Sequence, residues 1–119
     1  MSTQLDQFTI AYIECALWSS TDDDDNALDD NYSIEDIDKD CLSDMIEDCR
    51  IFQERHKADI QYNLTRAGHD FWLTRNGHGA GFWDGDWPED IGNRLTKHCK
   101  EDWGEATLYV DDNGKIQYV

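Results

Sequence analysis

The distribution of charge constrains this chain more than any other feature of its sequence. The chain has 27 Asp and Glu against 10 Lys and Arg, for a formal net charge of −17. Residues 22–48 contain thirteen of these acids and a single base, Lys39, whereas residues 49–119 contain twelve acids and nine bases. Because adjacent aspartates repel each other and form helices poorly, we expect residues 19–32 to be a solvated acidic loop.

Length and composition indicate one folded domain over residues 1–119. Hydrophobic residues make up 39% of the chain, and five Trp, five Tyr and four Phe are too many for a disordered protein. Residues 1–20 contain no Lys or Arg, and no apolar run approaches the roughly 18 residues that a membrane span needs, so we expect neither a signal peptide nor a membrane protein. The four cysteines form no C-x-x-C pair, which favours free, buried thiols in a reducing cytoplasm.

Three segments have the periodicity of amphipathic helices. Residues 5–18 and 41–59 repeat apolar side chains every three to four positions, with a stripe at 42, 45, 49, 52 and 56 in the second segment. Ser33 and Asp36 have the spacing of a capping box, and Asp40 is a second candidate cap. A third helix is expected after Asp86, with Ile91, Leu95 and Trp103 on its apolar face.

Two further regions predict hairpins. Residues 71–76 are rich in aromatic side chains, residues 77–81 have the composition of a turn, and residues 82–83 would begin the returning strand. Residues 107–110 and 115–119 flank Asn113-Gly114, a strong hairpin signal. The prediction is therefore an α+β fold of order α-α-β-β-α-β-β, with an antiparallel sheet of about four strands packed against about three helices.

The acidic segment has two readings. It could serve solubility alone, or its carboxylates could imitate the charge of a nucleic-acid backbone and bind a basic groove of another protein. It does not fit a calcium-binding EF-hand, because a loop starting at Asp24 places Leu28 and Asp29 where an oxygen ligand and Gly are needed. The candidate partner-binding residues are Asp22, Asp23, Asp24, Asp25, Asp29, Asp30, Glu35, Asp36, Asp38, Asp40, Asp44, Glu47 and Asp48.

The segment 68–87 combines glycines with aromatic and titratable residues. Gly77, Gly79 and Gly81 could form a backbone nest for an anion, although both the dinucleotide fingerprint and the P-loop pattern are absent. A tight hairpin held by aromatic packing is the structural alternative. Candidates for a secondary contact with a partner are Trp72, Arg75, His78, Trp83 and Trp87.

Nothing in the sequence identifies a catalytic or metal centre. His69-Asp70 and Asp84/Asp86 offer acid–base groups near the expected turn, but no nucleophile with an adjacent base is recognisable. The histidines and cysteines are scattered rather than closely spaced, unlike the ligands of zinc. We therefore expect no enzyme activity, no metal and no cofactor.

The run GHDFWLTRNGHGAGFWD, which begins at Gly68, carries a family resemblance. Together with the stretches on either side of it, this block resembles a family of small acidic proteins encoded by tailed bacteriophages and other mobile elements. The resemblance implies a phage accessory protein made in the bacterial host cytoplasm, and it supplies no catalytic residues.

These observations lead to one main hypothesis and two alternatives. The main hypothesis is a non-enzymatic inhibitor of a host defence complex, anti-CRISPR or anti-restriction, that presents a DNA-mimic-like face to a basic host protein or nucleoprotein complex. By analogy, small acidic phage proteins often act in this way. Such a chain would bind neither nucleic acid nor anionic membranes directly. The alternatives are a structural or regulatory phage protein with a basic partner, and a small ligand-binding protein or enzyme that uses the Gly/His hairpin.

Overall fold

The computed structural model describes residues 5–22, 24–61, 63–77, 81–83, 87–103 and 105–118, which are mostly helical. No described helix is both long and apolar enough to cross a membrane. The elements follow the order α1 (Gln7–Ser19), α2 (Leu28–Asn31), the 3₁₀ helix η1 (Ile34–Asp36), α3 (Lys39–Ile60), α4 (Leu64–Arg75), α5 (Glu89–Asp102), β1 (Leu108–Val110) and β2 (Ile116–Tyr118).

The structure confirms the three helices expected from periodicity. In α3 the predicted stripe is buried at Met45, Cys49, Phe52 and His56, whereas Leu42 at its start is only half-buried. The N-cap of α3 is Asp38 rather than Asp40, because the Asp38 carboxylate accepts a hydrogen bond from the Asp40 N–H at 3.1 Å. Helix α5 begins after Pro88, and the expected cap Asp86 lies outside the described residues.

The predicted α+β fold with a four-stranded sheet is wrong, because residues 71–75 of the expected strand belong to α4 and the fold is mostly helical. The N-cap of this helix is Asn63, whose side-chain oxygen accepts from the Arg66 N–H at 3.2 Å. All residues from Asp70 to Arg75 are buried, so α4 is enclosed on nearly every side. A helix buried all round has no polar face and therefore loses the periodicity that distinguishes it from a buried strand.

Close packing of α4 on α1 depends on a glycine. A Cβ added at Gly68 would lie 2.1 Å from the carbonyl oxygen of Phe8, so any larger residue would push the two helices apart. Behind this crossing, Phe52 of α3 stacks on Phe71 with 4.2 Å between ring centroids, and Tyr12 lies 5.2 Å from the same ring. The core is therefore an aromatic cluster shared by α1, α3 and α4.

The second predicted hairpin is confirmed and forms a two-stranded sheet. Strands β1 and β2 are antiparallel, with Leu108 opposite Tyr118 and Val110 opposite Ile116. Gly114 takes a φ of 75° in the turn, a left-handed conformation that glycine adopts without strain. The hairpin also joins the chain before α3, because the Asp38 N–H donates to the Ile116 carbonyl at 2.9 Å.

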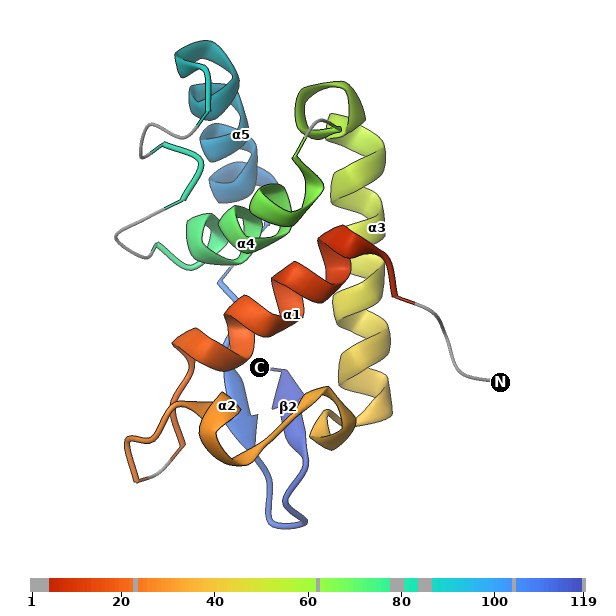
Figure 1. The fold of residues 1–119 in the computed structure, drawn as a ribbon, viewed down its shortest axis with the longest axis vertical. Helices are drawn as coiled ribbons and strands as arrows, with labels where there is room; N and C mark the ends of the chain where they lie inside the picture. The colour runs from red at the N-terminus through yellow and green to blue at the C-terminus, as the bar shows by residue number, and fades with distance from the viewer. Residues whose placement is uncertain are drawn as a thin grey trace.

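The elements gather at two ends of the molecule (Figure 1). The lower end in that view contains α2, the first turns of α3 and the hairpin, and α1 crosses the middle. The upper end contains α5 and the last turns of α3. We call the described part of residues 22–48 the acidic end, since it carries most of the excess negative charge.

Candidate functional site

The acidic end places most of its predicted binding residues on the surface. The loop before α2, α2 itself, η1 and the first turns of α3 all contribute, and Asp23 lies outside the described residues. The exposed carboxylates are Asp24, Asp25, Asp29, Asp30, Glu35, Asp40, Asp44 and Glu47.

Three other carboxylates of this segment hold the backbone in place. Asp22 accepts from the N–H groups of Asp24 at 2.9 Å and Asn26 at 3.0 Å, which closes the loop. Asp36 accepts from the Ser33 N–H at 2.8 Å in the predicted capping box, and Asp38 caps α3. These half-buried residues therefore support the exposed ones rather than add to the surface.

Asp48 is the exception among the predicted acids. Its carboxylate forms an ion pair with Arg75 at 3.0 Å and accepts from the Tyr118 hydroxyl at 3.0 Å. Arg75, which is 9% exposed, also donates to the Tyr12 hydroxyl at 3.0 Å and lies 5.6 Å from the Trp103 ring. Burial raises the pKa of both phenols, so they stay protonated in this network. Half-buried Asp48 therefore pairs with buried Arg75 and differs from the exposed carboxylates of the acidic end.

The predicted aromatic contact surface is largely internal. Trp72 is buried and donates to the Ser19 hydroxyl at 2.7 Å, and buried Trp87 donates to Asp70 at 2.7 Å. Trp83 is half exposed and remains available on the surface. His78 and Gly79, which belonged to the predicted contact and to the anion nest, lie outside the described residues.

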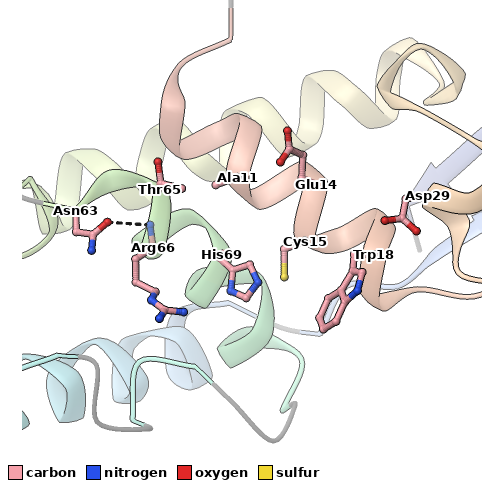
Figure 2. A pocket seen from close by; sticks show the side chains of 9 residues that line it. All are labelled: Ala11, Glu14, Cys15, Trp18, Asp29, Asn63, Thr65, Arg66 and His69. Atoms are coloured by element: carbon pink, nitrogen blue, oxygen red, sulfur yellow. Dashed lines mark hydrogen bonds between the residues drawn. The ribbon is translucent and has the colours of Figure 1, made fainter.

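A groove along the outer face of α1 was not foreseen from the sequence. One hollow of about 520 Å³ lies between α1 and the start of α4 (Figure 2). A second hollow of about 750 Å³ lies between α1 and the α2–η1 region. Glu14 and Asp29 line both hollows, so we treat them as one feature, the α1 groove. The sequence did contain one sign of this groove. Ile10 and Trp18 lie opposite the predicted apolar face of α1, so the helix has large apolar side chains on a second face as well.

The first hollow also brings together a thiol and an imidazole, Cys15 of α1 and His69 of α4 (Figure 2). Burial, together with the nearby charge of Asp70, raises the pKa of Cys15 to about 12. Since the thiolate is the reactive form of cysteine, this environment opposes nucleophilic catalysis near neutral pH. Burial likewise raises the pKa of the other three cysteines, and all four are free and buried, as expected.

The two distant histidines His56 and His98 are neighbours in the fold, with 5.0 Å between ring centroids at the contact of α3 with α5. Among the described residues, however, no three His, Cys, Asp or Glu side chains lie close enough to hold a metal ion. Compared with family models, curated proteins and solved structures, the chain gives no significant match.

Proposed function

We propose that this protein is a non-enzymatic binding protein whose acidic end occupies a basic, nucleic-acid-binding surface of a partner. More specifically, we propose that the protein is a phage inhibitor of a host defence complex, anti-CRISPR or anti-restriction, and that it acts in the bacterial cytoplasm. The carrying observation is the set of eight exposed carboxylates on a backbone held by Asp22, Asp36 and Asp38. The phage context comes from the resemblance of residues 68–84.

Charge spacing supports a mimic built from several elements rather than one helix. Asp40, Asp44 and Glu47 are four and three residues apart on α3, which puts one carboxylate at about every 4.5–6 Å of the helix axis. A DNA strand carries one phosphate per about 3.4 Å. The α3 row therefore needs the carboxylates of α2 and η1 beside it to approach the charge density of DNA.

The excess of acids over bases in this segment also supports a surface that binds a basic partner. Lys39 is the only base among residues 22–48, so the segment cannot neutralise itself. An unbalanced acidic surface steers basic partners toward it and speeds their association. A surface that needed only solubility would gain nothing from gathering its acids at one end.

The test compares two variants that lose the same number of negative charges. Replacing Asp24, Asp25, Asp29 and Asp30 by Asn removes four carboxylates from the acidic end, and Asn suits the left-handed φ of 65° at position 25. The control replaces the exposed acids Glu89, Asp90, Glu101 and Glu105 by amides. Tagged proteins are used to capture partners from bacterial lysates at low and high salt.

We expect the acidic-end variant to bind its captured partner about tenfold more slowly at low salt and with a flatter salt dependence, because it loses electrostatic steering. The control should behave nearly as the unmodified protein. Added DNA should displace the protein from its partner. Equal losses in both variants, or a partner that still binds DNA while occupied, would contradict the mimic.

A further inference from the structure

The outer stripe of α1 leaves large apolar side chains in solvent. Ile10 is 40% exposed and Trp18 is 60% exposed, and Glu14 lies between them at the same helical spacing. Ile10 and Trp18 are eight positions apart, or about 12 Å along the helix axis. An exposed apolar strip beside a groove is typical of a surface that another chain covers.

The larger hollow of the α1 groove has apolar walls. Leu5, Ile13 and Leu17 come from one side, and Tyr32 and Ile34 come from the other. Its volume of about 750 Å³ is enough for several aliphatic side chains. An apolar hollow beside the exposed Ile10 and Trp18 could take the apolar face of about two turns of a helix, one of the common modes of peptide recognition.

The charges beside the groove define the polar side of its occupant. The charged residues lining the larger hollow are both acids, Glu14 and Asp29, and exposed Asp30 adjoins Asp29 on α2. Arg66 and His69 line only the smaller hollow, toward α4. An acidic helix or an anionic membrane would be repelled, and a second copy of this chain would set its own Glu14 and Asp29 against the same carboxylates.

We propose that the α1 groove binds an amphipathic helix that carries Lys and Arg beside its apolar face. This inference deepens the proposed function, on which it rests, by assigning the basic partner a helix that binds beside the acidic end. The acidic end supplies long-range attraction, and the groove supplies the desolvated apolar contact that holds the complex.

The probe is a synthetic 14-residue peptide of Leu and Lys with Leu at helical positions i, i+3, i+4 and i+7. A second peptide has the same composition in an order that leaves no apolar face. Binding is measured by calorimetry at near-physiological salt. We expect the amphipathic peptide to bind at least about tenfold more tightly than the scrambled one.

The double substitution Ile10→Ser and Trp18→Ser should reduce binding of the amphipathic peptide to the level of the scrambled one. Because both side chains are exposed, the variant should keep its circular dichroism spectrum and urea midpoint. The control, Tyr109→Ser, removes a large side chain that is 46% exposed on β1, away from the groove, and it should bind like the unmodified protein. Equal affinity for both peptides, or an unaffected double variant, would overturn the groove proposal.

The acidic-end variant separates this inference from the proposed function. It should weaken both peptides by a similar factor, since it removes charge, including that of the groove-lining Asp29, and leaves the apolar walls of the groove unchanged. If only the groove proposal fails, that variant still loses its protein partner while the Ile10/Trp18 variant keeps it. If the proposed function fails, the acidic-end variant keeps its partner. A concentration-dependent dimer abolished by the Ile10/Trp18 variant would instead identify a second copy as the occupant and overturn the proposal.

Discussion

Carboxylates serve different purposes at the two ends of the molecule. At the end formed by α5 and the last turns of α3, they join helices: Asp59 binds Arg94 at 2.7 Å, and Asp102 lies 3.9 Å from Arg55. Asp102 also lies 3.1 Å from the His98 ring nitrogen. Negative charge in this region is balanced locally and connects one helix to the next.

At the acidic end, most carboxylates contact the backbone or solvent instead, apart from Glu47, which pairs with Arg50, and Asp48, which pairs with Arg75. Asp22, Asp36 and Asp38 accept from backbone N–H groups, and Lys39 is the only base that residues 22–48 themselves contain. Because one chain contains both arrangements, the negative charge is not a uniform coat that only prevents aggregation. The proposed function rests on this difference, since a basic partner would supply the cations that the acidic end lacks.

The sharpest way to break this contrast is Arg75→Met, which removes the base that neutralises Asp48. Asp48 would become another uncompensated carboxylate, and the hydroxyls of Tyr12 and Tyr118 would lose their donor. Removing one partner of a buried ion pair costs about 3–5 kcal/mol, so we expect that loss in the free energy of unfolding measured with urea. Arg50→Met on the exposed face of α3 is the control and should change little. If both variants lost a similar free energy of unfolding, Arg75 would contribute no more to stability than an exposed arginine does.

A second prediction concerns pH at the α3–α5 contact. His56 is 7% exposed, its Nε2 has no hydrogen-bond partner among the described residues, and its φ of −123° departs from helical values. Burial lowers its pKa below 6.5, as do His98 and Arg55, against the opposing effect of Asp59 and Asp102. As pH falls through about 6.5, the unfolded chain binds a proton that the folded chain does not, so stability should decrease.

Urea midpoints measured from about pH 8 to pH 5 test this effect. The slope should be clearly smaller in His56→Gln, which keeps a polar side chain but cannot titrate. An identical slope in both proteins would show that His56 does not control this pH range.

The smallest predicted effect concerns two kinds of carboxylate within the acidic end, those that cap the backbone and those that are exposed. Asp38→Ala removes the N-cap of α3 and should lower the free energy of unfolding by about 1 kcal/mol. Asp44→Ala removes an exposed carboxylate of the same helix and should cost much less, since Ala is a better helix former. Both are measured by urea denaturation, and equal costs would mean that the capping acids have no separate role.

The sequence predicted the elements whose pattern is local. Periodicity located α1, α3 and α5, and Asn113-Gly114 located the hairpin. It misplaced α4, because Phe71, Trp72 and Leu73 are all buried and so resemble a strand. Burial of every face is a tertiary effect that no local window of sequence records.

The residues of the candidate site were likewise predictable only where their pattern is local in the sequence. Exposure of the acidic segment could be predicted from its composition, since adjacent charges remain in water. Nothing local distinguished Asp48 from its neighbours, because its partner Arg75 is 27 positions away. The α1 groove depends on α2 and η1 packing beside α1, so its residues could not be grouped before the fold was known.

The hairpin also sets the order in which the molecule can assemble. The hydroxyls of Tyr12 and Tyr118 are 2.5 Å apart although 106 positions separate the residues, and contacts of such separation have a high loop-closure entropy. The same strand fixes the acidic end through Ile37, which pairs with Ile116. The helices can therefore pack before the carboxylates reach their final positions. We expect docking of the hairpin to complete the acidic end, because β2 holds Ile37 and Asp38 in place just before α3.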